Sequence, residues 1–406
     1  MPASFAAGRR SVPAAEPVTA GVTPRLETRG RPARVAHLTT VDLSLHALLA
    51  TELQVDLDAG CEVWGISAPG PYVAQVTALG VNHASVPSFD RSWNVRQDAR
   101  AARELLQVLR QLRPDVLHTH TPKAGVLGRM LGRLARVPVV VDTCHGLWTR
   151  PDQRAWLRRA VVGTEAVASR FAHAELYQNA EDRETLRRWV GGRGQVVGNG
   201  VDLTRWPGER RDRVRAEWGV AEDELLVGGV GRMVREKGIE EFAETARRLT
   251  GRARFVWVGP EDDAKADVLR AGDLAPAVRC AGARDDMPDV YAALDVFVLP
   301  SWREGFSRSG MEAAASGLPM VLTDIRGCRE IGRDGEHLLL VPPRDPAALT
   351  AAVSRMLSDP QLRDRLGTAA RLRALAHFDQ QAVARRSLET YVRVARRRGL
   401  PWVLVS

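Results

Sequence analysis

Short apolar segments alternate with stretches of helical periodicity along most of the chain, and this alternation restricts the fold more than any other feature. Strands buried on both faces and separated by helices are typical of parallel, doubly wound sheets. The clearest helical stretch, Val95–Arg113, keeps its apolar side chains at helical spacing and ends before Pro114. We therefore expect an α/β protein. The predicted strands form two sets, Arg34–Leu38, Cys61–Ile66, Asn82–Val86, Val116–Thr119, Pro138–Thr143 and Ala174–Gln178, then Leu225–Val230, Arg254–Val258, Ala277–Cys280, Asp295–Leu299, Pro319–Thr323 and Leu338–Val341.

The two strand sets predict two Rossmann-like domains, 34–190 and 191–377, with a junction near Gly191–Gly194 and a second set beginning near Gln195. Residues 1–33 are rich in Pro, Ala and Arg without periodicity, which predicts a disordered tail. Residues 378–406 begin with an amphipathic helix and are expected to contain no strand. Ligands of such sheets bind beyond the carboxyl ends of the strands, so two facing sheets predict a shared interdomain cleft.

Composition limits the partners. The 406 residues are 45% hydrophobic and 26% charged, and no apolar run has membrane-spanning length. The net charge of +9 suits a phosphorylated ligand, an anionic membrane or a nucleic acid, while arginines on solvated faces are an equally good explanation. The four cysteines have neither paired spacing nor a close histidine cluster, which argues against a zinc site or disulfides and favours the cytoplasm.

The stretch Ser301–Glu330 combines a loop, a helix start and two carboxylates after a buried strand. The first N–H groups of a helix lack internal partners and attract anions. Glu304 in the loop and Glu312 in the helix could both face the cleft and accept hydrogen bonds from hydroxyls. A helix-dipole carboxylate or a surface charge is the plainer interpretation of either. Together these features suit a ligand with phosphate and hydroxyl groups, such as a nucleotide sugar.

A second group of candidates follows the first strand of the second set. Gly231 and Arg232 end this strand, and Lys237 precedes a helix that begins near Ile239. Two cations at the carboxyl end of a strand suit a diphosphate, although solvated loop charges are an alternative. The Gly229–Gly231 pair lacks the third glycine of a dinucleotide fingerprint.

Three histidines follow strands in the first set. His118 and His120 end one strand and His145 ends the next. A histidine in this position can hydrogen-bond a sugar hydroxyl or a developing charge. We expect His145 in the cleft, whereas a core histidine bonded to backbone is the preferred interpretation of His118. The acidic runs Glu261–Asp263 and Asp285–Asp286 lack a converging third ligand, so no metal site is expected.

A basic helix over Lys123–Arg136, with Arg129, Arg133 and Arg136 near one face, could lie on anionic lipid. A solvated face is an equally good interpretation. The charges occur without paired stacking aromatics or finger spacing, so nucleic acid is not an expected partner.

Several motifs occur together in one order: DVLHTHTPKAGVLGR, VVVDTCHG, GNGVDLTRW, VGRMVREKG and EGFSRSGMEAAASGLPMVLTDIRGCRE. With these motifs the chain resembles the family 4 retaining glycosyltransferases of the GT-B fold over roughly 34–397. The TPKAG and TDIRGCRE segments are similar to the polysaccharide-assembly branch that extends polyprenyl-diphosphate-linked sugars. One departure concerns the loop after the first strand. Many members have Gly-Gly there, whereas this chain has Thr39, Thr40 and Asp42, which weakens the donor role that the resemblance implies for Thr40.

The resemblance implies a role for each matching residue. Arg232, which follows Gly231, and Lys237 would bind the donor diphosphate, and Glu304 would contact the transferred sugar. Glu312 would bind the ribose, the amides near Phe306 and Ser307 would hold phosphate, and Arg284 would lie near the base. His145 would line the sugar pocket, with His120 and Lys123 on the acceptor side. The final helix would cross back to the first domain.

These features predict a retaining, metal-independent glycosyltransferase without a cofactor. The expected donor is an NDP-sugar, with UDP favoured, carrying a hexose or N-acetylhexosamine. The acceptor hydroxyl would belong to a polyprenyl-diphosphate-linked sugar or to a small-molecule natural product, and the enzyme would be cytoplasmic, with or without contact with the inner membrane face. A UDP-sugar 2-epimerase of the same fold and a non-catalytic nucleotide-sugar-binding protein are the alternatives.

Overall fold

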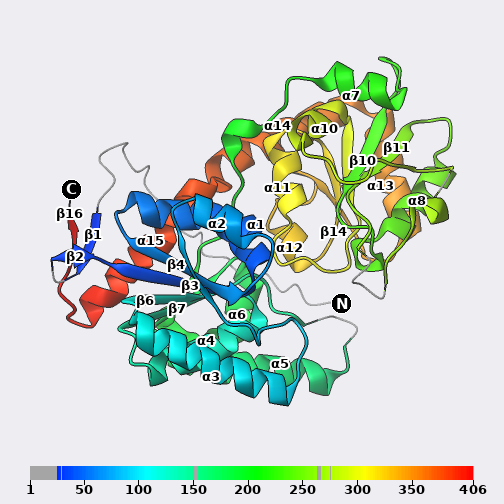
Figure 1. The fold of residues 1–406 in the computed structure, drawn as a ribbon. Helices are drawn as coiled ribbons and strands as arrows, with labels where there is room; N and C mark the ends of the chain where they lie inside the picture. Colours follow the sequence, from blue (N-terminus) through cyan, green and yellow to red (C-terminus); the bar gives the residue numbers. More distant parts are fainter. Residues whose placement is uncertain (1–24, 29, 150–152, 263–266, 275, 406) are drawn as a thin grey trace, which may run out of the picture.

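The computed structural model describes residues 25–28, 30–149, 153–262, 267–274 and 276–405. Each of two domains is built around its own parallel sheet (Figure 1). The predicted GT-B arrangement of two Rossmann-like α/β domains is confirmed.

The N-terminal domain contains seven parallel strands in the order β5-β4-β3-β6-β7-β8-β9. Every strand predicted for this domain is present, with ends that shift by a few residues. The predicted junction near Gly191 is wrong, because the strand at Gly194–Val196 pairs with its neighbour in this sheet rather than opening the second domain. The strands are β3 Arg34–Val41, β4 Glu62–Ala68, β5 Asn82–Ser85, β6 Val116–Thr119, β7 Val139–Cys144, β8 Ala174–Tyr177 and β9 Gly194–Val196.

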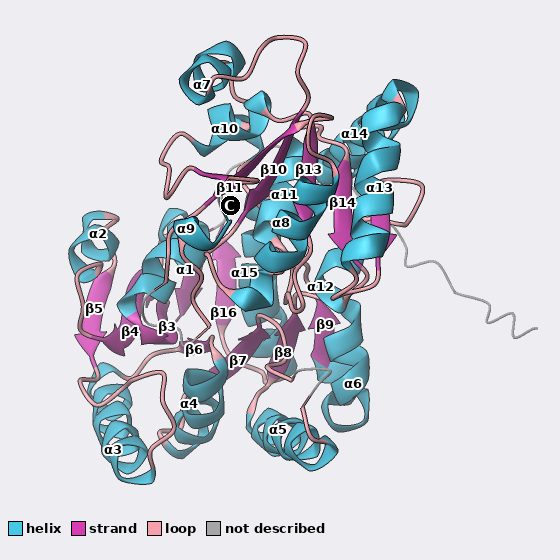
Figure 2. Cartoon of the chain, turned by 90° about the vertical axis from the view of Figure 1, so that its right-hand side faces the viewer, coloured by secondary structure: helices cyan, strands magenta, loops and turns pink. Residues whose placement is uncertain are grey.

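Helices cover both faces of this sheet, as Figure 2 shows. Successive residues of β3 point to opposite faces, so Val35 joins the apolar cluster beneath α1 and α15, whereas Ala36 and Leu38 join the cluster beneath α3. His37 lies between them on the α1 side and is fully buried. The helices are α1 Asp42–Asp58, α2 Val73–Ala78, α3 Val95–Leu112, α4 Pro122–Leu134, α5 Ala155–Ala168, α6 Ala180–Val190 and, from the end of the chain, α15 Gln380–Arg397.

The C-terminal domain contains a six-stranded parallel sheet in the order β12-β11-β10-β13-β14-β15, the strand order of a dinucleotide-binding fold. Its core includes Trp257, Phe242 and Phe297. The strands are β10 Leu226–Val230, β11 Arg254–Val258, β12 Arg279–Cys280, β13 Val296–Leu299, β14 Met320–Thr323 and β15 Leu339–Val341; the helices are α7 Arg211–Trp218, α8 Ile239–Arg248, α9 Ala271–Leu274, α10 Met287–Ala293, α11 Arg308–Ala315, α12 Arg326–Arg329, α13 Pro346–Ser358 and α14 Pro360–His377.

The chain crosses between the domains twice, and the two crossings are hydrogen-bonded to each other. The Val201 amide donates to the Phe378 carbonyl at 2.9 Å, and the Gln380 amide donates to the Val201 carbonyl at 3.2 Å. After the second crossing α15 packs on α1 and β7 of the N-terminal domain. Figure 1 shows this red helix lying against the blue one.

The two ends of the described chain meet in a small antiparallel sheet. β1 (Arg25–Thr28) pairs with β16 (Trp402–Val405) on one side and with β2 (Arg31–Pro32) on the other. The expected disordered tail over 1–33 is therefore wrong for these residues, and the expectation of no strand after the final helix is wrong as well. Residues 1–24 lie outside the described part.

Candidate active site

A cleft of about 770 Å³ lies between the carboxyl ends of the two sheets. The loops that follow the central strands β3 and β6 contribute to it from the N-terminal domain, and the loops after β10 and β13 contribute from the C-terminal domain. These are the topological switch points of both sheets, where ligands of this architecture bind. The structure brings to this cleft six residues predicted from sequence: Thr40, Lys123, His145, Arg232, Lys237 and Glu304.

On the C-terminal side, Lys237 and Glu304 form a close ion pair. Lys237 Nζ lies 2.6 Å from Glu304 Oε1, and this oxygen also accepts a hydrogen bond from Ser301 Oγ at 2.8 Å. Both side chains are mostly shielded from solvent, with 18% and 12% of the side chain exposed. The pair thus presents a cation and a carboxylate, held in one position, to anything that enters the cleft.

Arg232 is half-buried at the end of β10 and directs its guanidinium to carboxylates of its own domain. It pairs with Asp262 and lies 3.4 Å from Glu236. Gly231 immediately precedes Arg232. A Cβ on Gly231 would contact the aliphatic part of the Lys237 side chain. An incoming diphosphate would compete with these carboxylates for Arg232, so the site holds its cations in place before the anion arrives.

Ser307 and Glu312 belong to the start of α11. Ser307 is buried and caps the helix by accepting from the Gly310 amide at 3.1 Å, while Phe306 packs edge-on against Phe378. Glu312 accepts from Tyr291 at 3.0 Å and from Arg308 at 3.2 Å. Burial raises the pKa of Glu312 above its ordinary value despite these partners.

The residues of α11 lie next to a second part of the cleft, with a volume of about 390 Å³. This part is lined by Arg308 and Arg205 from the C-terminal side and by Gln178 and His145 from the N-terminal side. Glu312 reaches it in this structure only through its partner Arg308. The ribose role of Glu312 stays a prediction.

On the N-terminal side, His145 lines both parts of the cleft, and both of its ring nitrogens are engaged. Gln178 Nε2 lies 2.9 Å from Nδ1, and His120 Nδ1 lies 3.0 Å from Nε2. His120 is 1% exposed and sits directly behind His145 rather than in the cleft. Burial lowers the pKa of both histidines, so both rings are neutral near pH 7.

Thr40 and Lys123 are tightly held within the N-terminal domain. Thr40 Oγ1 lies 2.9 Å from Thr121 Oγ1. Lys123 is 3% exposed, and its ammonium group lies 2.6 Å from Asp98 Oδ1 and above the ring of Trp93. Lys123 therefore anchors the loop that carries Trp93 to the rim of the cleft. Its predicted contact with the acceptor stays a prediction.

The domains touch at the floor of the cleft through two glycines. A Cβ on Gly305 would lie 2.0 Å from the His145 carbonyl oxygen, and a Cβ on Gly146 would lie 2.6 Å from Gly305 Cα. Asn179 donates to the Gly305 carbonyl at 3.0 Å, and Arg326 pairs with Asp182 at 2.6 Å. Glu304 precedes Gly305 and His145 precedes Gly146, so this contact places Glu304 and His145 opposite each other.

One sequence expectation about basic residues stays a prediction, and another is corrected by the structure. Arg284 forms ion pairs with Glu217 and Asp286 and is absent from the lining of both parts of the cleft, so its place near the base stays a prediction. The basic face expected over Lys123–Arg136 is interrupted, because Arg129 is 1% exposed and bonds the carboxylates of Glu165 and Glu175. Charge spacing along a helix does not reveal acids that arrive from other elements.

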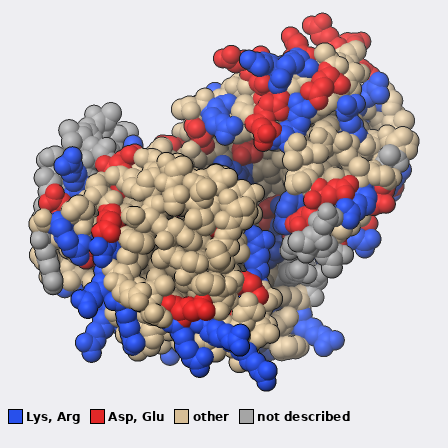
Figure 3. All heavy atoms as spheres, viewed as in Figure 1, with Lys and Arg blue, Asp and Glu red and all other residues tan. Residues whose placement is uncertain are grey.

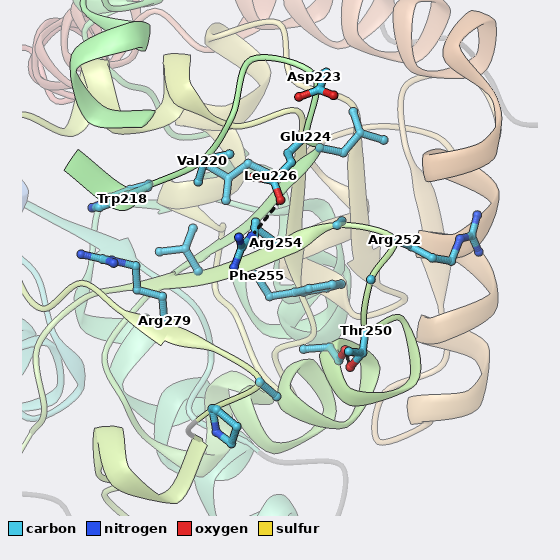
Figure 4. A pocket seen from close by; sticks show the side chains of 17 residues that line it. Trp218, Val220, Asp223, Glu224, Leu226, Thr250, Arg252, Arg254, Phe255 and Arg279 are labelled. Carbon is cyan, nitrogen blue, oxygen red and sulfur yellow. Dashed lines mark hydrogen bonds and ion pairs between the residues drawn. The ribbon is translucent and has the colours of Figure 1, made fainter. Parts of the chain in front are cut away.

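A further hollow of about 650 Å³ lies at the opposite edge of the C-terminal sheet (Figure 4). It is formed around the amino ends of β10, β11 and β12, where Arg254 pairs with Glu224. Because catalytic groups of this architecture gather at the carboxyl ends of the strands, this hollow is not a candidate active site.

Several cleft residues received no role from the sequence, although Glu236, Arg303 and Arg326 lie within stretches described above. Trp148 stacks on Trp93 at the rim, and Arg303, Glu236 and Arg326 line the cleft. His37, which lies behind His120, had one usable signal, a lone histidine within an apolar strand. Within the described residues, no helix combines the length and apolarity needed to cross a bilayer.

Comparisons with known proteins match this architecture. Residues 48–205 match the family model Glycosyltransferase Family 4, and residues 224–359 match the model Glycosyl transferases group 1. In solved structures, HepE of Anabaena in complex with UDP and glucose superposes with a TM-score of 0.75 at 20% identity over 88% of this chain and 99% of that one. The sucrose-phosphate synthase of Thermosynechococcus elongatus gives 0.76 at 22% identity, over 90% and 100%.

Curated relatives agree in sequence. An Escherichia coli "UDP-Gal:alpha-D-GlcNAc-diphosphoundecaprenol alpha-1,3-galactosyltransferase" is 28% identical over 68% of this chain and 74% of its own length. A Campylobacter jejuni "N,N'-diacetylbacillosaminyl-diphospho-undecaprenol alpha-1,3-N-acetylgalactosaminyltransferase" is 26% identical over 89% and 99%. A Mycobacterium tuberculosis "Glycogen synthase" is 31% identical over 71% and 70%. With two facing Rossmann-like domains and both family models matched in order, the chain belongs to the family 4 glycosyltransferases of the GT-B fold and is a glycosyltransferase.

Proposed function

We propose that the protein transfers a hexose or N-acetylhexosamine from a UDP-sugar, with retention of configuration, to a hydroxyl of a polyprenyl-diphosphate-linked sugar. The observation that carries this proposal is the group formed by Lys237, Glu304 and Arg232 at the ends of β10 and β13, opposite His145. It offers cations for a diphosphate and a carboxylate for sugar hydroxyls within one cleft. Membership of family 4 favours transfer over the epimerase alternative.

The leaving diphosphate gains negative charge as the bond to the sugar breaks. Arg232, Lys237 and the N-terminus of α11 would stabilise that charge more in the transition state than in the ground state. Glu304 holds Lys237 in place at 2.6 Å before the donor binds, so little reorganisation is needed. In the proposed retaining reaction the departing phosphate oxygen takes the proton of the acceptor hydroxyl, and both events occur on the same face of the sugar.

The acceptor class rests on the relatives from Escherichia coli and Campylobacter jejuni, whose names specify undecaprenyl-diphosphate-linked sugars. The rim of the cleft suits a sugar acceptor. Trp93 and Trp148 stack with ring centroids 5.8 Å apart, and Trp93 is 52% exposed, so this pair offers exposed aromatic surface to a sugar ring.

The donor is tested by calorimetry with a panel of UDP-, GDP- and ADP-sugars, followed by turnover with short-chain polyprenyl-diphosphate sugars. We expect binding of one UDP-sugar and formation of an elongated lipid-linked glycan whose new linkage keeps the donor configuration by NMR. Conversion of UDP-N-acetylglucosamine into an isomeric nucleotide sugar without acceptor, or an inverted linkage, would contradict the proposal.

We propose further that transfer needs no metal, because protein cations are placed to balance the diphosphate charge. Turnover in EDTA should equal turnover in magnesium. A loss of activity in EDTA that magnesium restores would show that a metal takes over part of the role given to Lys237 and Arg232.

Contact with the membrane is proposed through the start of α5 rather than through α4. Trp156 is 62% exposed and is followed by exposed Leu157, Arg158 and Arg159, close in sequence to the cleft-lining Gln153. Figure 3 shows Lys and Arg side chains along the lower edge of the N-terminal domain. An exposed tryptophan among arginines suits the interface of an anionic bilayer.

Flotation with vesicles of phosphatidylglycerol and phosphatidylcholine tests this contact. The wild type should float at low salt and Trp156→Ser should float less, whereas Trp189→Ser, on the exposed side of α6, should behave as wild type. Equal flotation of both variants would place the contact elsewhere.

A further inference from the structure

A continuous chain of hydrogen bonds leads from the cleft into the core of the N-terminal domain. It begins at Gln178 and His145 and continues to His120, whose Nε2 lies 3.1 Å from His37 Nδ1. It ends where His37 Nε2 meets Asp56 Oδ2 at 2.8 Å. His120, His37 and Asp56 are 1%, 0% and 0% exposed, so water has little access to the inner links.

Which ring donates and which accepts in each of these hydrogen bonds can be followed from the cleft end. Gln178 donates from its amide nitrogen to His145 Nδ1, so the proton of a neutral His145 must be on Nε2. His145 then donates to His120, His120 donates from Nε2 to His37, and His37 donates to the Asp56 carboxylate. The Asp56 carboxylate, which can only accept, sets the same direction from the inner end, so the tautomers of the three rings and the orientation of the Gln178 amide are coupled.

Adding one proton reverses the direction of every bond except the last, in which His37 donates to Asp56 in both states. The proton enters at His145 Nδ1, and each ring passes the proton of its other nitrogen inward. His145 gives up Nε2–H to His120, and His120 gives up Nε2–H to His37. The positive charge comes to rest on His37, which keeps both N–H groups, beside the Asp56 carboxylate. His145 then carries its proton on Nδ1, and Gln178 must turn its amide oxygen toward it.

The groups around His37 favour this charge. Asp56 and Glu52 face it from α1, His118 from β6 and His120 from just after β6; Tyr391 of α15 and Cys61, just before β4, lie near Asp56. Burial by itself lowers the pKa of His37, but the hydrogen bond and charge of Asp56 and the charge of Glu52 outweigh it and raise the pKa. His118 stands beside the chain, 2.6 Å from Tyr391 and 2.7 Å from Thr143.

We propose that Asp56, His37 and His120 are positioning residues, a buried proton relay that sets the tautomer of His145 and the orientation of the Gln178 amide at the cleft. With the relay neutral, Gln178 turns its nitrogen to His145 and leaves its oxygen for the pocket that it lines. With the relay protonated, the pocket meets the amide nitrogen instead. A hydrogen-bond acceptor for sugar hydroxyls is thereby exchanged for a donor.

NMR of the whole protein labelled with 15N in its histidine rings tests the relay directly, with signals assigned by single His→Gln variants. At a pH above that of the relay's protonation we expect His145 protonated at Nε2 with Nδ1 bare. As the pH falls, His145, His120 and His37 should change together in one transition. A His145 that is protonated at Nδ1 at alkaline pH, or that titrates independently of His37, would overturn the proposal.

Two variants sharpen the test. Asp56→Asn removes the charge that stabilises protonated His37, so the shared transition should move to lower pH by about 1–3 units. Asp58→Asn, an exposed acid of the same helix, should leave it unchanged. Gln178→Glu can only accept a hydrogen bond, and it suits only the protonated relay, in which His145 carries its proton on Nδ1, so the shared transition should move to higher pH. A transition that stays in place in Gln178→Glu contradicts the relay, whether or not Asp56→Asn folds.

The catalytic consequence rests on the proposed function. In the pH profile of kcat, the acid limb should move with Asp56→Asn as the NMR transition does, and a limb that stays in place would separate the relay from turnover. A protein without transferase activity but with the expected NMR transition would refute the function and leave the relay intact.

A metal ion is the rival occupant of the same cluster, because ligand atoms of His37, Glu52, His118 and His120 all lie within 4.8 Å of one another. Zinc would need deprotonated ring nitrogens of His37 and His120, which the relay holds in hydrogen bonds. Metal analysis of the purified protein should therefore find far less than one equivalent of zinc. One equivalent, with a melting temperature that falls on chelation, would overturn the relay.

Discussion

The two sides of the cleft hold their polar groups in opposite ways. On the N-terminal side, His120 is buried and His145 is partly buried; both are neutral and bonded to each other, and His145 is also bonded to Gln178. On the C-terminal side, Lys237 and Arg232 are charged, partly exposed and paired with carboxylates that a substrate can displace. The N-terminal side therefore acts as a fixed template, whereas the C-terminal side is a set of ion pairs that rearranges when an anion binds. Loss of a fixed group should affect folding, and loss of an exchangeable group should affect turnover.

The largest loss of stability is expected in the N-terminal domain, on replacement of the buried Arg129. Replacement by Met leaves the buried carboxylates of Glu165 and Glu175 without their cation, which should destabilise the N-terminal domain by about 3–5 kcal/mol. Hydrogen exchange of the α4 and β7 amides measures this loss. Arg133→Met, an exposed site on the same helix, should cost far less, and equal losses would show that the buried network does not stabilise the domain.

Substitution of a charged residue on the C-terminal side of the cleft should mainly lower the rate of turnover. Lys237→Ala should lower kcat by roughly 10²-fold, or about 3 kcal/mol, because the charge that forms on the leaving diphosphate loses a partner. Thermal stability should fall less than in Arg129→Met, since Glu304 keeps its hydrogen bond from Ser301. Arg235→Ala, two residues earlier and exposed, is the matched control. Turnover of Lys237→Ala near that of the wild type would remove the diphosphate assignment.

The contact between the two sides can be disturbed at Gly305. An alanine methyl there would collide with the His145 carbonyl, so the sides must move apart or tilt. We expect turnover to fall by up to about 10²-fold, because small displacements of reacting groups are costly, while each domain stays folded. Gly272→Ala, where a Cβ meets no atom within 4 Å, controls for the substitution itself. A rise in KM alone would show that the contact serves binding rather than alignment.

The sequence was sufficient for most of the architecture, because buried parallel strands carry a dense local signal. The helix expected over Val95–Arg113 is α3 at Val95–Leu112, and the strand expected over Arg254–Val258 is β11 with the same ends. The strands at Arg25–Thr28 and Trp402–Val405 were missed because each gains its hydrogen bonds from the other end of the chain. β9 was assigned to the wrong domain for a similar reason, since pairing with β8 decides its sheet.

The site was predicted less completely, and the misses have a common physical cause. Loop residues after central strands, such as Lys237 and Glu304, were found because topology alone brings them to the cleft. Lys123 and Arg129 look like solvated charges along a helix, and only tertiary structure supplies the acids that bury them. Arg284 sits in a loop of the expected kind, and the sequence did not indicate its ion pairs with Glu217 from α7 and with Asp286.

The paired crossings between the domains have a mechanical consequence. A single connecting segment would let the domains rotate about any axis. Here two segments cross between the domains side by side, and backbone hydrogen bonds among Val201, Phe378 and Gln380 join them. Twisting one domain against the other would shear these bonds, whereas a swing about the line through both crossings would leave them intact. The two domains should therefore open and close mainly by rotation about a single hinge axis. Glu304 should then approach His145 along nearly the same path in every catalytic cycle.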